Sequence, residues 1–213
     1  MIAAALAYAS RLGLSIIPVA SDCRTPLVGP TEDCRGGVHR ASADPAEIGV
    51  WWREWPNANI AAASGPVSGL LVLDVDSKNG KDGFASLSAL EQEHGPLPTT
   101  WRDSTPSGGG HFYFRHPADR APRNRTCFRP GLDLKAAGGL ITLPPSKRPD
   151  GQYSWLVHPL RSPLAAMPPW LLDLVDPPQP ARPPVPAVTP QARAWKHRCR
   201  RSRGGARPTS RMQ

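Results

Sequence analysis

The sequence contains no run of apolar residues that approaches the roughly 18 needed for a membrane-spanning helix. No basic residue precedes the Ala-rich start, Met1–Ala9, and Arg11 and Gly13 soon interrupt the apolar stretch, so a secretory signal is not expected. Cysteine is scarce, and the four cysteines are too scattered for a disulfide framework. These absences predict a cytoplasmic protein that has no membrane partner.

Acidic residues are absent from the last 37 residues, which hold nine Lys and Arg. Subtracting these nine from the 26 basic residues of the chain leaves 17, which balance the 17 Asp and Glu, so the net charge of +9 belongs to the tail. We expect one folded, neutral domain over residues 1–176 and a disordered tail over residues 177–213, Pro-rich up to Pro190 and Arg-rich beyond it. The tail is either an idle end or a tether that holds nucleic acid near the body through phosphate contacts.

Hydrophobic and turn-forming residues in the body predict more strands than helices. The run Asp44-Pro45-Ala46-Glu47 predicts a capped helix start in which Glu47 bonds back to Asp44, and the tryptophans that follow are expected in the core. Gly138-Gly139 predicts a hairpin between strands at Leu132–Lys135 and Leu140–Leu143. The expected class is α+β, a mixed β-sheet flanked by a few helices, with no internal repeat. The other expected elements are helices at Ala3–Leu12, Asp82–His94 and Met167–Val175 and strands at Ser15–Val19, Asn59–Ser64, Leu70–Asp74, His111–Phe114 and Tyr153–Leu156.

The first motif that carries chemistry is Asp74-Val75-Asp76, at the end of a continuously apolar strand. Alternate residues of a strand point to the same face, so the two carboxylates are expected to project together. Two adjacent carboxylates repel unless a cation lies between them, and oxygen ligands suit Mg²⁺ or Mn²⁺. Taken alone, the pair is better explained by a solvated strand end or a turn cap, because this spacing is common.

The second motif is Ser107-Gly108-Gly109-Gly110-His111. Consecutive glycines let backbone N–H groups approach an anion closely, and the strand that follows would hold His111 in a fixed position. Such a histidine can contact a triphosphate. A flexible turn beside a core histidine is the alternative.

The third motif, Asp133-Leu134-Lys135, again places two polar side chains on one strand face. An acidic and a basic residue at this spacing often form only a surface pair. With the first two motifs, however, it completes a set of three carboxylates, a histidine and a lysine on separate strands, which is what a two-metal phosphoryl-transfer site requires.

In order and approximate spacing, these motifs resemble the three motifs of the archaeo-eukaryotic primase superfamily. More closely, the chain is similar to the bifunctional DNA primase/polymerase N-terminal domain of plasmid and phage replication proteins. The similarity runs from about Ala3 to Trp155 and includes the strings Trp51-Trp52, Pro56-Asn57-Ala58-Asn59-Ile60, Leu73-Asp74-Val75-Asp76, Glu93-His94-Gly95-Pro96-Leu97-Pro98, Thr105–His111, Gly131-Leu132-Asp133 and Pro144-Pro145-Ser146.

The resemblance implies a catalytic core with an RNA-recognition-like sheet. It also implies a template-dependent nucleotidyltransferase that synthesises primers and extends DNA in the replication of a plasmid, phage or other mobile element. Asp74, Asp76 and Asp133 would be catalytic and would hold two Mg²⁺ or Mn²⁺ ions.

The resemblance also implies the substrates and partners. A single-stranded DNA template, a primer and dNTP or NTP would bind, and a separate replicative helicase is left open as a further partner. The residues that would bind the phosphates of the incoming nucleotide come from the glycine loop and from the third motif: Ser107, Gly108, Gly109, Gly110, His111 and Lys135.

Two other functions share part of this pattern. A non-catalytic, single-stranded nucleic-acid-binding remnant of a larger replication protein would suit a short chain with a neutral body, but it does not need three carboxylates and His111. A metal-dependent nuclease would use the carboxylates but leaves the glycine–histidine element unexplained. Cys23, Cys34 and His39 lie in one expected loop, but their spacing matches no zinc pattern and a fourth ligand is missing, so we expect them to be unbound.

Overall fold

The larger sheet has six strands, in the order β11-β4-β5-β3-β7-β6. The computed structural model describes residues 1–78, 80 and 82–177, and the tail expected from the sequence lies outside the described residues from position 178 onward. The strands of this sheet are β3 (Leu70–Val75), β4 (Arg102–Ser104), β5 (Gly110–Arg115), β6 (Arg125–Arg129), β7 (Leu132–Lys135) and β11 (Ser154–Val157).

The centre of this sheet is a split β-α-β unit. Helix α3 (Gly83–His94) connects β3 to β4, and β5 then returns between these two strands. With β7 on the other side of β3, this is the strand order of an RNA-recognition-like core. The predicted α+β class is therefore confirmed. The sheet is not mixed in direction, because every pairing between the named strands is antiparallel.

The alternation of side chains along β3 decides what each face of the sheet contacts. Leu71, Leu73 and Val75 pack against α3 and against α4 (Pro169–Val175), on one face. Val72 lies on the opposite face, in a second core cluster that it shares with the smaller sheet. Asp74 follows Val72 by two residues, so its side chain is also turned toward the smaller sheet.

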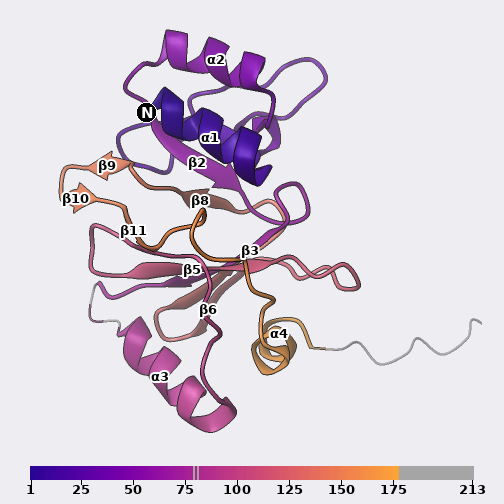
Figure 1. Cartoon of the computed structure of the whole chain (residues 1–213), viewed down its shortest axis with the longest axis vertical. Helices are drawn as coiled ribbons and strands as arrows, with labels where there is room; N and C mark the ends of the chain where they lie inside the picture. Colours follow the sequence, from indigo (N-terminus) through magenta and orange to yellow (C-terminus); the bar gives the residue numbers. More distant parts are fainter. Residues whose placement is uncertain (79, 81, 178–213) are drawn as a thin grey trace, which may run out of the picture. The chain divides into compact units, whose positions relative to one another are not determined.

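The smaller sheet has the order β1-β2-β8 and consists of β1 (Ile16–Val19), β2 (Asn59–Ala63) and β8 (Leu140–Thr142). Helices α1 (Ile2–Leu12) and α2 (Pro45–Glu54) lie over it (Figure 1). Trp51 and Trp52 of α2 are 4% and 3% exposed and belong to its core, as predicted. The longest helix among the described residues is α3, with 12 residues. No helix in the described part of the chain has the length and apolar character of a membrane span.

The predicted hairpin around Gly138-Gly139 is wrong. Leu132–Lys135 and Leu140–Leu143 do not form a hairpin, because β7 pairs with β3 and β6 whereas β8 pairs with β2 of the other sheet. Gly138-Gly139 instead carries the chain from one sheet to the other. Gly138 has a φ of +77°, and a side chain at Gly139 would collide with the Ser64 hydroxyl.

The start of α2 has the predicted Asp44 cap but not the reciprocal bond from Glu47. Asp44 accepts a hydrogen bond from Ala46 N at 2.9 Å, as predicted. The expected return bond from Glu47 is absent from this capped turn, because Glu47 forms an ion pair with Arg40 at 3.2 Å and the Asp44 N–H donates to the Ser42 hydroxyl at 3.1 Å.

Four strands were not predicted from the sequence. One is β4, which has only three residues. Strand β6 is an exposed edge strand with an irregular register, and its polar composition gives no clear alternation. Strands β9 (Lys147–Arg148) and β10 (Gly151–Gln152) form a two-stranded hairpin. This hairpin brings Arg148 and the following Tyr153 to the space between the two sheets.

Candidate active site

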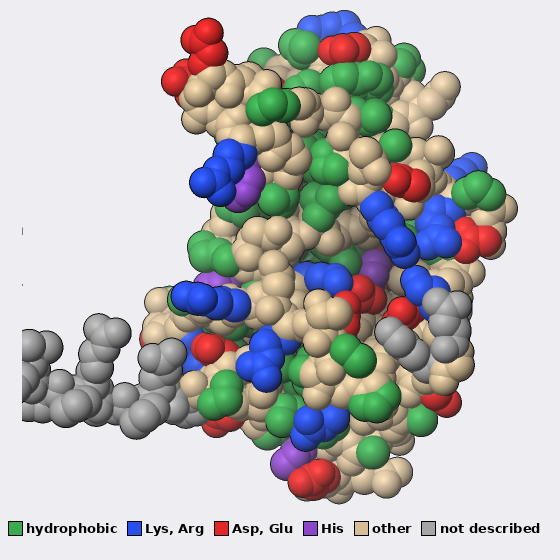
Figure 2. Space-filling model, turned by 180° about the vertical axis from the view of Figure 1, so that it is seen from behind, with side chains coloured by type: hydrophobic (Ala, Val, Ile, Leu, Met, Phe, Trp, Pro, Cys, Tyr) green, Lys and Arg blue, Asp and Glu red, His purple; other side chains and the backbone are tan. Residues whose placement is uncertain are grey.

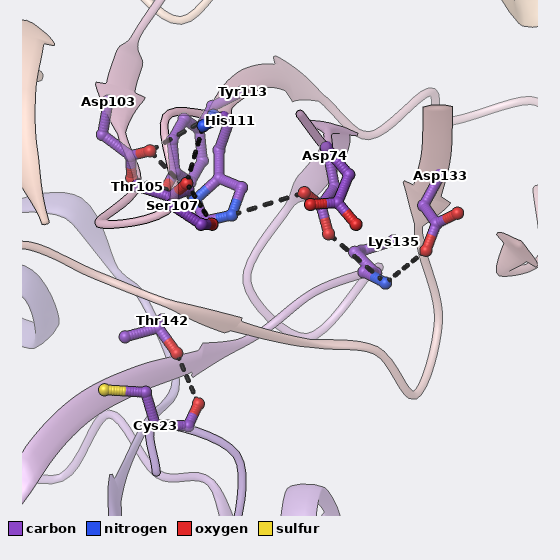
Figure 3. A network of polar contacts seen from close by, with 12 residues as sticks. Cys23, Asp74, Asp103, Thr105, Ser107, His111, Tyr113, Asp133, Lys135 and Thr142 are labelled. Atoms are coloured by element: carbon purple, nitrogen blue, oxygen red, sulfur yellow. Dashed lines mark hydrogen bonds and ion pairs between the residues drawn. The ribbon is translucent and has the colours of Figure 1, made fainter. Parts of the chain in front are cut away.

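Four polar side chains form a row across four adjacent strands of the larger sheet (Figure 3). Asp103 of β4 lies opposite His111 of β5, His111 lies opposite Asp74 of β3, and Asp74 lies opposite Asp133 of β7. Directly opposite residues of antiparallel strands share a face and lie within contact distance. Strand register alone therefore gathers three of the carboxylates and the histidine.

Lys135 lies between the two carboxylates at one end of the row. Its Nζ atom is 3.0 Å from Asp133 Oδ2 and 3.5 Å from Asp74 Oδ2. Burial disfavours the charged amine, but the two carboxylates outweigh burial and raise the pKa of Lys135. Asp133 is also held by the edge strand, since its Oδ1 accepts a hydrogen bond from Cys127 N at 2.7 Å.

Backbone contacts fix Asp76 just beyond the end of β3. Its N–H donates to Gly131 O at 2.8 Å, and its carbonyl accepts from Gly83 N at 3.0 Å. The two glycines pack so tightly that a side chain on Gly83 would lie 2.5 Å from Gly131 O. Asp76 Oδ1 is 3.5 Å from Lys78 Nζ, and Asp76 lines the same pocket as Asp74.

His111 is buried and is held from behind by Asp103. Its Nδ1 atom is 2.9 Å from Asp103 Oδ1, and its Nε2 atom is 3.7 Å from Asp74 Oδ1. Burial lowers the pKa of the imidazole, but the charge and hydrogen bond of Asp103, with a further contribution from Asp74, outweigh burial, so the pKa of His111 is raised. A protonated ring at this position would suit an anionic ligand.

The glycine loop is shaped by its own hydrogen bonds. Gly108 N donates to Thr105 O and Gly109 N donates to Thr105 Oγ1, both at 3.1 Å. Gly109 also packs against the Val75 carbonyl, where a side chain would collide. Close packing thus explains the glycine there, and the predicted phosphate role of Gly108, Gly109 and Gly110 remains a prediction. Ser107 lines the pocket.

The row opens into a pocket of about 330 Å³ between the two sheets. Space-filling shows Lys and Arg side chains gathered near carboxylates and a recessed histidine on this side of the molecule (Figure 2). The floor, on the larger sheet, holds six of the predicted site residues: Asp74, Asp76, Ser107, His111, Asp133 and Lys135. The predicted Gly108, Gly109 and Gly110 are not among the lining residues. The opposite wall comes from the smaller sheet and the β9–β10 hairpin. The residues of the opposite wall include Cys23, Arg24, Thr142, Arg148 and Tyr153.

Several of these residues were not predicted as site residues. Arg24, Arg148 and Tyr153 reach the pocket only through tertiary packing, so no local signal could find them. Asp103 could have been found, because a hairpin through the Thr105–Gly110 loop places Asp103 opposite His111.

The loop cysteines have other partners. Cys23 is buried, and its Sγ accepts a hydrogen bond from Asn59 Nδ2 at 3.1 Å. Burial is the main cause that raises the pKa of the Cys23 thiol to about 11, which disfavours the thiolate that a metal needs. The Cys34 thiol donates to Arg35 O and His39 O, both at 3.2 Å.

The carboxylate cluster has the chemistry of a divalent-cation site. Its donors are all oxygens, which suit Mg²⁺ and Mn²⁺. Among residues 1–78, 80 and 82–177, no three His, Cys, Asp or Glu side chains are close enough to enclose a metal ion without rearrangement. Two lysines nevertheless form ion pairs with these carboxylates. Lys135 contacts Asp74 and Asp133, and Lys78 contacts Asp76. The residues therefore fit a cation of this class.

Removal of Lys135 should make this cluster depend on added metal. We expect Lys135→Met to lower the stability of the metal-free protein by about 1 kcal/mol, or roughly 2–4 °C in melting temperature, because Asp74 and Asp133 then repel each other. Mg²⁺ should raise the melting temperature of this variant more than that of the wild type. Lys147→Met, at an exposed position on β9, serves as the control. An equal metal response in all three proteins would contradict the prediction.

Comparison with known families agrees with this geometry. Residues 5–170 match the family described as bifunctional DNA primase/polymerase, N-terminal. A comparison with curated proteins gave no match. The family match spans most of the chain and includes every residue of the row, and it confirms the resemblance found in the sequence. The chain therefore belongs to the bifunctional DNA primase/polymerase N-terminal domain family.

Proposed function

We propose that the chain is a template-dependent nucleotidyltransferase that synthesises primers and extends DNA in the replication of a plasmid, phage or other mobile element. The observation that carries this proposal is the row of Asp103, His111, Asp74 and Asp133. Three of its members, His111, Asp74 and Asp133, face one pocket together with Lys135. The pocket volume of about 330 Å³ lies in the range of small-molecule sites, roughly 300–1,000 Å³.

In this proposal Asp74, Asp76 and Asp133 would hold two Mg²⁺ or Mn²⁺ ions. Bound there, the ions would activate the primer 3′-hydroxyl and neutralise the charge of the triphosphate. The chain's own contribution is to keep the three carboxylates in fixed places. Asp74 and Asp133 are fixed by strand register, and Asp76 is fixed by its backbone bonds to Gly131 and Gly83.

The triphosphate would lie between two groups of cations. His111 and Lys135 are on the floor of the pocket, and Arg24 and Arg148 are on the opposite wall. Contacts from both sides would orient the α-phosphate relative to the primer, and such positioning supplies much of the rate in phosphoryl transfer. Ser107 is placed to add a neutral hydrogen bond at the entrance of the glycine loop.

Nucleotide incorporation tests the proposal directly. The purified chain would be incubated with a single-stranded DNA template, labelled dNTPs and Mn²⁺, with and without a primer. Products whose composition follows the template support a nucleotidyltransferase. A folded protein that binds the single strand without incorporating nucleotide would instead support a non-catalytic binding remnant.

His111 should contribute more to nucleotide binding than to metal binding. A charge-assisted contact to phosphate is worth about 1.5–3 kcal/mol, so His111→Ala should weaken dNTP affinity roughly tenfold or more. Affinity for Mn²⁺ alone should change much less. Isothermal titration with dATP and, separately, with Mn²⁺ measures both, and unchanged dATP affinity would refute the role of His111.

A further inference from the structure

Asp103 is a buried carboxylate behind the pocket rather than a residue of its lining. It lies on β4, is 0% exposed, and is separated from Asp74 by His111. Within the described part of the chain, His111 is the basic side chain that contacts it. A carboxylate is costly to bury unless hydrogen bonds compensate for the lost water.

Both oxygens of Asp103 accept hydrogen bonds from β5. Oδ1 accepts from the backbone N–H of His111 at 3.2 Å and lies 2.9 Å from its Nδ1 atom. Oδ2 accepts from the Tyr113 hydroxyl at 2.5 Å. His111 and Tyr113 are two residues apart on one strand, so both face the same carboxylate.

Aromatic rings hold the imidazole in this orientation. Tyr153 stacks on His111, with ring centroids 6.0 Å apart and planes at 20°, and Tyr113 meets it edge-on at 6.1 Å and 90°. Because Nδ1 is engaged by Asp103, Nε2 is the ring atom left on the side of Asp74 and the pocket. A flipped or rotated ring would lose the bond to Asp103.

We infer that Asp103 is a positioning residue, whose carboxylate binds Nδ1 of His111 and thereby directs Nε2 toward the triphosphate of the incoming nucleotide. The inference rests on the proposed function. A partner on one ring nitrogen commonly decides which way the other nitrogen is presented. The competing explanation is that Asp103 only satisfies the buried Tyr113 hydroxyl and so serves the fold.

A double-mutant cycle separates these explanations. Asp103→Asn keeps the size of the side chain and one acceptor, and Asp103→Leu keeps the size alone. The affinity for dATP with Mg²⁺, without template, would be measured for each substitution in the wild-type and His111→Ala backgrounds. We expect Asp103→Leu to weaken dATP binding roughly tenfold or more and Asp103→Asn to weaken it less. Neither should weaken it further once His111 is alanine.

Two further measurements exclude a purely structural effect. Tyr113→Phe keeps the aromatic ring but removes the other side-chain donor to Asp103, so it should lower the melting temperature while dATP affinity stays within about twofold. The Nδ1–H proton resonance of His111 should be lost in Asp103→Leu, as in His111→Ala. If Asp103→Leu does not fold, Asp103→Asn supplies both readouts.

The possible results are distinct. Wild-type dATP affinity in both Asp103 variants, beside a weakened His111→Ala, would overturn the inference and leave the proposed function intact. Equal losses from the Asp103 substitutions in both backgrounds would also overturn it, because the effect would then not pass through His111. Unchanged affinity in His111→Ala itself would mean that the proposed nucleotide site is wrong, and the inference would fall with it.

Discussion

Replacement of both Asp74 and Asp76 by asparagine is expected to abolish nucleotide incorporation, with a loss of at least about 10³-fold. Metal ions in phosphoryl transfer supply several kcal/mol of charge stabilisation, and each 1.36 kcal/mol is a factor of ten in rate. Asparagine keeps the size of each side chain but removes the negative charge that attracts a divalent cation. Incorporation of labelled dNTP on a primed template measures the loss.

The same double substitution should leave the fold nearly unchanged. The two carboxylates repel each other, but Asp74 also contacts Lys135 and His111, and Asp76 contacts Lys78. These effects oppose each other at a partly exposed site, so we expect a change in stability of less than about 1 kcal/mol in either direction. Thermal unfolding followed by circular dichroism checks this.

A matched control removes two charges elsewhere. Glu32 and Asp33 are adjacent, exposed and in a loop. Glu32→Gln with Asp33→Asn makes the same change in net charge and should retain full incorporation. A well-folded Asp74→Asn, Asp76→Asn protein that still incorporates nucleotide at the wild-type rate would remove these residues from the site.

Local signals in the sequence predicted most of the elements that hold the site. The apolar run that begins at Leu70 predicted a buried strand over Leu70–Asp74, and β3 extends one residue further, to Val75. The helix after Asp82 and the strand around His111 were also predicted, because each depends on neighbours within a few residues. The carboxylate, histidine and lysine positions could be chosen because strand alternation fixes the face of each side chain.

Features that depend on distant pairing could not be predicted in this way. The local sequence is compatible with a hairpin around Gly138-Gly139, but β7 pairs with β3 in the larger sheet and β8 pairs with β2 in the smaller sheet. Because the chain passes from one sheet to the other between β7 and β8, the smaller sheet and the β9–β10 hairpin form the opposite wall of the pocket. No local sequence pattern therefore marked Arg148 and Tyr153 as pocket residues. Asp103 is a different case, because its pairing with His111 is local and a hairpin through the glycine loop would have revealed it. It was missed because buried carboxylates are rare and no pattern within a single strand marks one.

The second large effect is expected from Gly83→Ala, which adds a single methyl group. Gly83 and Gly131 pack around the backbone of Asp76, and a Cβ on Gly83 would lie 2.5 Å from Gly131 O and 2.7 Å from Asp76 O. These are backbone atoms with little freedom to move, so overpacking should cost about 1–3 kcal/mol of stability. Gly83→Ala should therefore unfold at a lower temperature than the wild type.

Gly49→Ala is the matched control, because it makes the same substitution in a helix with open space. A Cβ on Gly49 of α2 would make only an ordinary contact, 3.5 Å from the Arg53 guanidinium. Alanine is favoured over glycine inside a helix by about 0.5–1 kcal/mol, so this variant should be more stable than the wild type. The two substitutions should thus change the melting temperature in opposite directions.

Gly83→Ala should also impair catalysis, in addition to its effect on folding. The methyl group pushes on the carbonyl of Asp76 and on Gly131, whose carbonyl accepts the Asp76 N–H, so the carboxylate moves although no charge is removed. Misplacement of a catalytic group by about 1 Å can cost 10²-fold in rate, and we expect a loss of this order in incorporation, together with weaker Mn²⁺ binding. Both are measured well below the unfolding temperature of the variant. A destabilised Gly83→Ala protein that incorporates nucleotide and binds Mn²⁺ like the wild type would show that the position of Asp76 is not set by this contact.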